Sequence, residues 1–205
     1  MDKRALILLA AAAGGFAWWY MASQVDPAES GGQSETSLIE SAMSTVTNLM
    51  TSVPDAVQDP QVWAFLQLIR AGEGTTGPDG YRTMFGGGLF ASYADHPRRA
   101  ITRGSITSTA AGAYQFLSRT WDEMASAYGL ADFSPANQDV AAVGLIKRRG
   151  ALADVLAGRF RDAIDKCSKE WASLPGSPYG QPTLSYVQAQ DILLAHGADI
   201  LGSVA

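Results

Sequence analysis

The spacing of apolar residues along the chain predicts a mostly helical protein. Between residues 37 and 53 apolar side chains recur every three or four positions, and Ser37 with Glu40 forms a capping box. Pro54 would end this amphipathic helix. Its polar face carries Ser, Thr and Asn instead of Lys and Arg, which favours packing on a protein surface or self-association over binding to anionic lipid.

A second helix is predicted from Asp59-Pro60, an N-cap followed by proline at the first helical position, to Gly72-Glu73-Gly74. Further helices are expected from Ser118 to Gly129, from Ser134-Pro135 to about Arg149, over 151–157, over 159–171, and from Thr183 to Gly197. Residues 74–108 are rich in Gly, aromatic and β-branched residues without a helical period, so loops and a small irregular hairpin are expected. The predicted fold class is therefore α+β and mostly α.

The N-terminus has the pattern of a membrane anchor. Lys3-Arg4 precedes the uncharged run from Ala5 to Ala22, which is about long enough to cross a bilayer. The positive flank predicts a cytoplasmic N-terminus with residues 23–205 on the other side of the membrane. A cleavable signal peptide is the alternative, but Tyr20 disrupts the small-residue cleavage pattern before Ala22. The run is rich in Ala and Gly, so its insertion into the membrane is less favourable than that of a Leu-rich span, and later release of the protein from the membrane is an open alternative.

This pattern divides the chain into residues 1–22 as anchor, 23–56 as a linker with the amphipathic helix, and 57–205 as one domain. The hydrophobic content of 47% and five Trp suffice for a core. The net charge of −5 is uneven: residues 1–56 carry two basic against six acidic residues, and residues 57–205 carry 13 against 14. Neither part has the basic excess of a nucleic-acid-binding protein, so this class is excluded.

Metal-binding and disulfide chemistry have few candidate residues. Cys167 is the single cysteine, and His96 and His196 are the only histidines. These counts exclude an intrachain disulfide framework and a Cys-rich metal site, and they make a multi-His zinc site improbable. We expect no metal or other cofactor, and we expect Cys167 to be a small buried core residue.

Glu73 is the strongest candidate for catalysis. The apolar stripe of its helix runs directly into Gly72-Glu73-Gly74, which predicts a sharp turn with Glu73 at the C-terminal end of a core-facing helix. The partial negative charge of the helix end and apolar neighbours would raise the pKa of Glu73, as a general acid near neutral pH requires. The alternative is a solvated glutamate in a glycine loop.

The segment from Ser108 to Phe116 suits a sugar ligand. Gly112 would let the backbone approach a ligand closely, Tyr114 offers a stacking face, and Gln115 supplies both a donor and an acceptor. Structural roles for the same residues remain the alternative.

Several motifs follow one another along the chain: Gly72-Glu73-Gly74-Thr75, Gly80-Tyr81, Gly86-Gly87, Tyr93…Asp95-His96-Pro97-Arg98, Gly112…Tyr114-Gln115, Gln138-Asp139, Trp171-Ala172-Ser173-Leu174-Pro175 and Tyr179-Gly180-Gln181. Together they resemble the lambdoid-phage endolysins, "lysozymes" that act as peptidoglycan lytic transglycosylases. The resemblance covers about residues 60–181 in unbroken order and implies a lysozyme-like domain. The chain departs from the family pattern at Arg82 and Gly88, where the family has acidic residues.

The resemblance also implies roles for individual residues. Glu73 matches the catalytic acid, and Gln115 and Tyr114 match the segment that lines the sugar cleft. Weaker substrate-binding candidates are Tyr93 and Tyr179. Asp95 and His96 belong to the matching pattern, either as functional residues or as residues that hold a loop.

The implied reaction needs one carboxylate. A hydrolytic glycosidase normally uses two, whereas a lytic transglycosylase uses the muramoyl 6-hydroxyl of its substrate as nucleophile. Asp79 and Asp95 are possible second carboxylates, so a hydrolytic muramidase is one alternative. An inactive, membrane-anchored peptidoglycan-binding protein is another. The expected partners are peptidoglycan glycan strands and, through residues 5–22, the bacterial inner membrane, with the catalytic domain in the periplasm and a phage or prophage origin.

Overall fold

The computed structural model describes residues 35–205, so the predicted membrane span at residues 5–22 lies outside the described residues. None of the helices within 35–205 has the length and apolar character needed to cross a membrane. The chain divides into two compact units, Met1–Val46 and Thr47–Ala205, and each is described by itself.

The described residues form mostly helices with one small sheet, as the apolar pattern predicts. The α-helices are α3 (Glu35–Met50), α4 (Val53–Ala56), α5 (Pro60–Glu73), α6 (Ser118–Tyr128), α7 (Pro135–Arg148), α8 (Leu152–Leu156), α9 (Phe160–Cys167) and α10 (Tyr186–Ala195). A short 3₁₀ helix, η1, spans Gly80–Arg82, and the strands are β1 (Ile101–Arg103) and β2 (Ile106–Ser108). The predicted α+β fold class, mostly α, is therefore confirmed for these residues.

The predicted amphipathic helix at 37–53 exists with different ends. Helix α3 begins two residues before Ser37, so this serine lies inside the helix instead of capping it. The helix ends at Met50, and Pro54 lies in the first turn of α4, where Ser52 accepts a hydrogen bond from the backbone N–H of Asp55. Proline fits there because the first N–H groups of a helix have no partner within the helix. Pro54 therefore helps to start a helix, and its predicted role as a terminator was wrong.

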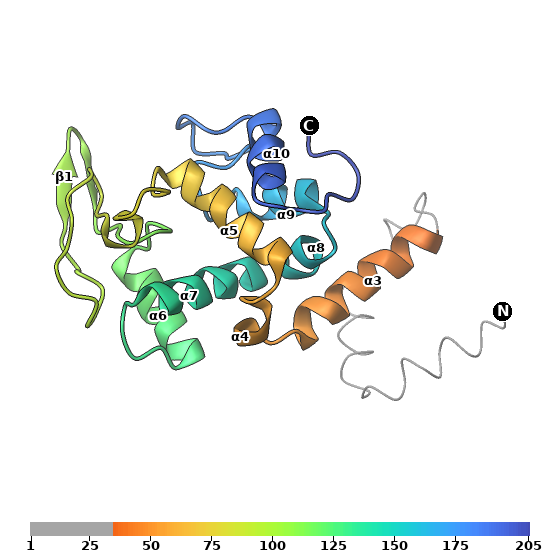
Figure 1. The fold of residues 1–205 in the computed structure, drawn as a ribbon, viewed down its shortest axis with the longest axis horizontal. Coiled ribbons are helices and arrows are strands. Elements are labelled where there is room, and N and C mark those ends of the chain that lie inside the picture. Colours follow the sequence, from red (N-terminus) through yellow and green to blue (C-terminus); the bar gives the residue numbers. More distant parts are fainter. Residues whose placement is uncertain (1–34) are drawn as a thin grey trace. The chain divides into compact units, whose positions relative to one another are not determined.

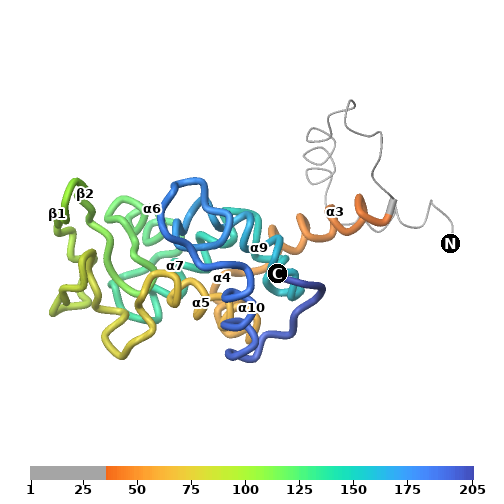
Figure 2. The backbone as a smooth tube through the Cα atoms, turned by 90° about the horizontal axis from the view of Figure 1, so that it is seen from above, coloured from red at the N-terminus to blue at the C-terminus, as the bar shows by residue number. Residues whose placement is uncertain are grey.

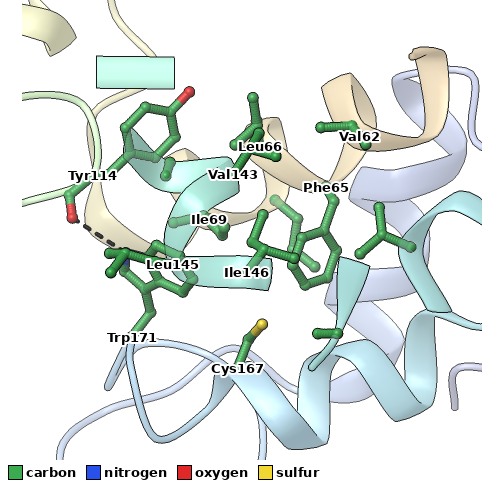
Figure 3. Packing of buried hydrophobic residues seen from close by; sticks show 14 of the residues in the cluster. Val62, Phe65, Leu66, Ile69, Tyr114, Val143, Leu145, Ile146, Cys167 and Trp171 are labelled. Carbon is green, nitrogen blue, oxygen red and sulfur yellow. Dashed lines mark hydrogen bonds between the residues drawn. The ribbon is translucent and has the colours of Figure 1, made fainter. Parts of the chain in front are cut away.

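Helix α5 is central to the unit that begins at Thr47. It packs against α7, α8 and α10, and Figure 1 shows it between the teal α7 and the blue α10. Its inward side chains are fully buried, among them Val62, Phe65, Leu66 and Ile69. They meet α7 residues and Cys167, which confirms the predicted buried cysteine (Figure 3).

The irregular region predicted at 74–108 is also confirmed. Strands β1 and β2 pair antiparallel, with Ile101 opposite Ser108 and Arg103 opposite Ile106. Isolated bridges join Thr83 to Leu89 and Met84 to Ala111. Figures 1 and 2 place this hairpin at the end of the unit away from α8 and α9.

Local capping sets most helix ends near their predicted positions. Asp59 caps α5 by accepting hydrogen bonds from the N–H groups of Gln61 and Val62, and Gly129 ends α6 with a φ of 65°. The last helix is capped by Ser185, not by Thr183, because Ser185 and Gln188 form a reciprocal capping box. Ser118 is the first residue of α6 and makes no cap hydrogen bond there.

The compact unit begins before the predicted domain boundary at residue 57. Val53 is 2% exposed and Ala56 is 3% exposed, so α4 belongs to the core. Asn48 donates to the carbonyl of Lys147 and accepts from the N–H of Leu152. These contacts join the end of α3 to the end of α7 and the start of α8, so residues 47–56 belong to the compact unit that begins at Thr47.

Candidate active site

Glu73 is the last residue of α5, followed by Gly74 in the left-handed conformation with a φ of 69°. The N–H of Gly74 donates to the carbonyl of Ala71 and that of Thr75 to the carbonyl of Arg70, which closes the helix end. This geometry confirms the turn predicted from the Gly-Glu-Gly sequence, because glycine adopts a positive φ at low cost. The turn places a partly buried carboxylate at the surface of the helix end.

The Glu73 carboxylate has one hydrogen-bond partner in the described part of the chain. Ser173 Oγ donates to Glu73 Oε1 at 2.7 Å. Burial raises the pKa of Glu73, and the Ser173 hydrogen bond opposes this rise because it stabilises the ionised form. The predicted direction is therefore confirmed, with burial as the main cause. A raised pKa keeps more of the acid protonated as the pH approaches neutral.

Close packing at Gly72 brings Ser173 to Glu73. A Cβ atom on Gly72 would lie 2.5 Å from Ser173 Oγ and 3.0 Å from Ser173 Cβ. The first distance is shorter than real Cβ contacts and the second is tight, so a side chain at residue 72 would displace the Ser173 hydroxyl. Gly72 therefore favours the contact between the two segments.

The loop after Glu73 is held by a buried arginine. Arg70, 7% exposed, donates to the carbonyl of Thr75 at 3.0 Å and lies 4.7 Å from the centre of the Tyr81 ring. Thr75 Oγ1 in turn donates to the carbonyl of Ala113. These bonds fix the chain on the far side of Glu73 to the segment that carries Gln115.

A cleft of about 480 Å³ lies beside Glu73. Its walls come from α5, the hairpin, the 110–120 segment and the 170–182 loop, and they include Glu73, Phe85, Ile106, Gln115, Leu117, Thr120, Glu170, Trp171, Ser173 and Gln181. These walls contain both apolar side chains and amide groups. Such a surface suits a sugar chain, which presents apolar ring faces and hydroxyl groups.

Gln115 lies in the cleft wall in a constrained conformation. Its φ is 49°, and its Nε2 donates to the carbonyls of Thr83 and Gly112 at 3.1 and 2.9 Å. A positive φ in a non-glycine residue persists only where the surroundings hold it. For Oε1 we find no hydrogen bond to any residue between 35 and 205, so this oxygen can accept one from a ligand.

Tyr114 does not provide the predicted stacking face. The side chain is only 1% exposed, and its hydroxyl donates to Asp139 Oδ1 at 2.6 Å. Its carbonyl accepts a hydrogen bond from Trp171 Nε1, drawn in Figure 3. Gly112 is likewise buried, and a Cβ atom there would collide with Gln138 and Phe133 instead of approaching a ligand. The Tyr114 ring and Gly112 therefore pack against α7, but Tyr114 also belongs to the lining of the cleft, so its role in sugar binding stays a prediction.

Asp95 and His96 hold a loop. Asp95 pairs with Arg98 at 2.8 Å and accepts from Trp121 Nε1, and the Arg98 hydrogen bond lowers the pKa of Asp95. His96 is 2% exposed. Its Nδ1 accepts a hydrogen bond from the N–H of Arg98. Its Nε2 therefore carries the proton and donates it to the carbonyl of Phe116. Burial lowers the pKa of His96. Neither residue lines the cleft, so the structural alternative holds.

The remaining candidates also lie outside the cleft wall. Tyr93 packs its ring edge-on against Phe90, with 5.6 Å between ring centres. Tyr179 is 56% exposed and donates to the carbonyl of Lys169. Asp79 is exposed and lies 3.8 Å from Arg82. None of the three lies in the cleft wall beside Glu73.

Glu170 is the second acidic residue in the cleft wall. It accepts from Arg148 at 3.1 Å and from Arg149 at 2.7 Å, and its side chain is 10% exposed. Both ion pairs direct the Glu170 carboxylate toward Arg148 and Arg149, so its oxygens are already engaged within the protein.

The sequence-based interpretation assigned no role to Ser173 or Asp139, although both lie in quoted motifs. Asp139 accepts from both Tyr81 and Tyr114, and burial raises its pKa. A Gln-Asp pair inside an amphipathic helix was the available signal for a buried polar network. Ser173 gave no such signal, because its partner lies 100 residues away. Across the described residues we find no cluster of three or more His, Cys, Asp or Glu side chains that could hold a metal ion.

Solved structures of known proteins share this architecture. The structure described as bacteriophage lambda lysozyme complexed with a chitohexasaccharide has a TM-score of 0.67 and 42% sequence identity, and the match covers 70% of this chain and 97% of that one. A second structure of lysozyme from bacteriophage lambda has a TM-score of 0.62 and 40% identity, with the same coverage. The fold is therefore lysozyme-like.

Sequence comparison identifies the family. Residues 63–200 match the Endolysin family, so the chain belongs to it. The endolysin of Escherichia phage lambda is 45% identical over 148 residues, covering 69% of this chain and 91% of the relative. The endolysin of Escherichia phage P2 is 40% identical over 134 residues, covering 58% of this chain and 81% of the relative. This membership places the chain among phage endolysins and lysozymes, which degrade peptidoglycan.

Proposed function

We propose that this endolysin is a lytic transglycosylase with Glu73 as its one catalytic acid and base. It would cleave the β-1,4 bond between N-acetylmuramic acid and N-acetylglucosamine and leave 1,6-anhydro ends. The observation that carries the proposal is the contrast between the two carboxylates of the cleft. Burial raises the pKa of Glu73, whereas Glu170 is bound by two arginines. One proton-donating carboxylate suits a reaction in which the substrate supplies its own nucleophile.

The proton path follows from the Glu73 contacts. Oε1 accepts from Ser173, which leaves Oε2 to carry the proton. Oε2 donates this proton to the leaving glycosidic oxygen as the bond to the muramoyl C1 breaks. The resulting carboxylate is stabilised by Ser173, and it then takes the proton from the muramoyl 6-hydroxyl as that oxygen bonds to C1. The acid is thereby restored without water.

The sugar chain is placed by the walls of the cleft. Phe85, Ile106 and Leu117 supply apolar surface, and Gln115 Oε1 and Gln181 supply polar groups. We propose that they bind glycan strands of peptidoglycan. In support, the related lambda lysozyme was solved in complex with a chitohexasaccharide.

A hydrolytic muramidase is the second candidate. It would need another carboxylate to activate water or to form a covalent intermediate. Asp95 and Asp79, the carboxylates considered from sequence, do not line the cleft, so they support this candidate less well than the single-residue mechanism.

We also propose that residues 5–22 tether the enzyme to the inner membrane, with the catalytic unit in the periplasm. The support is the uncharged run after Lys3-Arg4. Terminal sequencing of the mature protein should find Met1 or Asp2, and a start near Ser23 would contradict the tether. The exposed apolar residues Leu38, Ile39 and Met43 on α3 are compatible with the predicted self-association.

Replacement of Glu73 tests the catalytic proposal. Glu73→Gln keeps the shape and should reduce peptidoglycan cleavage by about 10²–10⁴-fold, the usual contribution of a general acid. Asp95→Asn and Asp79→Asn are the matched controls and should retain most activity. Unchanged cleavage by the folded Glu73→Gln variant would overturn the assignment. Absence of cleavage by the unmodified protein would favour the inactive binding protein.

A further inference from the structure

A second cavity lies next to the cleft and is lined by charged residues. Its volume is about 500 Å³, and its lining consists of Arg148, Arg149, Asp162, Asp165, Lys166 and Lys169. Arg148 and Arg149 reach from this cavity to Glu170, a wall residue of the cleft beside Glu73. One group of ion pairs therefore separates the cavity from the cleft.

Three of the four cations that line this cavity are held in ion pairs with carboxylates. Glu170 is one carboxylate shared by Arg148 and Arg149. Asp154, with a side chain only 4% exposed, is one carboxylate shared by Arg159 and Lys166. The arginine pair is balanced, because Arg148 also binds Glu123, whereas Arg159 and Lys166 share the single carboxylate of Asp154.

Lys169 adds a further cation at the cavity wall. It is exposed, and its ammonium group makes no hydrogen bond or ion pair that we find with the rest of the described chain. Its backbone is fixed, because its carbonyl accepts from both Arg149 and Tyr179. An ammonium group held on a fixed backbone is available to a ligand.

Carboxylates also line the cavity. Asp165 accepts from the hydroxyl of Tyr186 and pairs with Arg161, and Asp162 is exposed on the same helix, α9. The lining therefore presents cations beside carboxylates. A ligand that carries both carboxylate and amine groups complements this lining better than a purely anionic one.

Peptidoglycan supplies such a ligand at the appropriate place. Each muramoyl sugar carries a short stem peptide with free carboxylates and, where it is not cross-linked, a free amine. A strand bound in the cleft must place such peptides beside it. A plain chitin oligosaccharide carries none, so a peptide subsite would distinguish the two glycans.

We propose that the cavity lined by Arg149, Lys166 and Lys169 binds the stem peptide of peptidoglycan and favours peptide-bearing strands over bare glycan. This inference rests on the proposed function, because it assumes that the glycan occupies the cleft. Arginine and lysine bind the peptide carboxylates, and Asp162 with Asp165 binds the free amine. The site acts on substrate choice and takes no part in bond cleavage.

Charge reversal at Lys169 tests the proposal in the full-length protein. The substrates are peptidoglycan glycan strands with their stem peptides and the same strands stripped of peptides. Lys169→Glu should raise KM for the peptide-bearing strands by roughly 3- to 10-fold, the range for losing and reversing one partly exposed ion pair. KM for the stripped strands and kcat for both should stay unchanged. Lys169→Arg should leave KM and kcat for both substrates as in the unmodified protein.

A matched charge reversal provides the control. Arg99 is exposed and lies in the loop before β1, outside both cavities, so Arg99→Glu should change neither KM. Equal effects of Lys169→Glu on both substrates, or no effect on either, would overturn the peptide subsite.

Direct binding separates this inference from the proposed function. The free stem tetrapeptide, titrated into the full-length protein, should bind the unmodified chain and Glu73→Gln alike, and Lys169→Glu more weakly. Peptide binding that survives Lys169→Glu unchanged would overturn the site even if the enzyme cleaves peptidoglycan. Failure of the unmodified protein to cleave any strand would overturn the proposed function and leave the binding result to decide the subsite.

Discussion

Ser173 donates a 2.7 Å hydrogen bond to Glu73 Oε1, although the two residues are 100 positions apart in the sequence. The contact joins the end of α5 to the loop after α9. It stabilises the ionised form of Glu73, against the effect of burial. Ser173 therefore adjusts the pH range over which Glu73 can donate a proton.

Ser173→Ala should shift the basic limb of the pH profile upward. An acid catalyst loses activity as the pH rises through its pKa, and removal of the hydroxyl takes away a contact that lowers the pKa of Glu73. The measurement is kcat/KM on peptidoglycan as a function of pH. Ser177→Ala, in the same loop but without a contact to Glu73 that we find, is the control. An unchanged basic limb in Ser173→Ala would contradict the role of this contact.

Gly72→Ala should reduce activity without unfolding the protein. Its Cβ atom would lie 2.5 Å from Ser173 Oγ, so Ser173 must move and the hydrogen bond to Glu73 is lost. Displacement of a catalytic group by about 1 Å can cost up to roughly 100-fold in rate, and we expect a loss of about 10- to 100-fold.

Gly77→Ala is the matched control for this change. A Cβ atom at residue 77 meets nothing within 4 Å, and its φ is not in the left-handed region, so activity should not change. Wild-type activity in Gly72→Ala would show that the close approach of Ser173 is not needed.

Glu73→Gln should stabilise the fold at neutral pH. The folded state holds the Glu73 proton more tightly than the unfolded chain does, so stability falls as the pH rises from about 4.5, the ordinary value, through the raised pKa. The neutral amide avoids this loss. Thermal unfolding should give a higher Tm for Glu73→Gln at pH 7 and similar Tm values at pH 4.

Asp95→Asn should change the stability at pH 7 in the opposite direction. The pKa of Asp95 is lowered by Arg98, so its charge adds stability above its unfolded pKa and this stability is lost as the pH falls through the lower folded value. The variant should therefore be less stable than the unmodified protein at pH 7. For Glu73→Gln, a lower Tm at neutral pH would contradict the raised pKa of Glu73.

Sequence periodicity predicted most of the helices, though not α4, and the position of Glu73, because these features follow from local rules. Apolar spacing identified α5, and a cap at Asp59 and a glycine at residue 74 set its ends. The orientation of loop residues was not predictable in the same way. Tyr114 and Gln115 are adjacent and both line the cleft, yet the Tyr114 ring is buried with its hydroxyl on Asp139, whereas the Gln115 side chain is only partly buried.

Long-range contacts explain the remaining differences between the predicted and the observed structure. The hydrogen bond between Ser173 and Glu73, and that between Asp139 and Tyr114, join segments with no local signal for each other. The same holds for the domain boundary. Val53 looked like the end of a linker helix, but it is buried in the core.

Removal of residues 47–56 should destabilise the domain. A chain that begins at Val57 lacks Val53 and the Asn48 contacts to Lys147 and Leu152. Loss of one buried valine-sized side chain costs about 1.5–3 kcal/mol. Denaturant unfolding should show at least this difference from a chain that begins at Thr47. Equal stability of the two chains would place the boundary at residue 57 after all.

Mass analysis of the products from purified peptidoglycan tests the central claim most directly. With Glu73 as the one catalytic carboxylate and the muramoyl 6-hydroxyl as nucleophile, the products should carry 1,6-anhydromuramic acid ends. Products with reducing muramic acid ends, heavier by one water, would contradict this mechanism and identify the enzyme as a hydrolase.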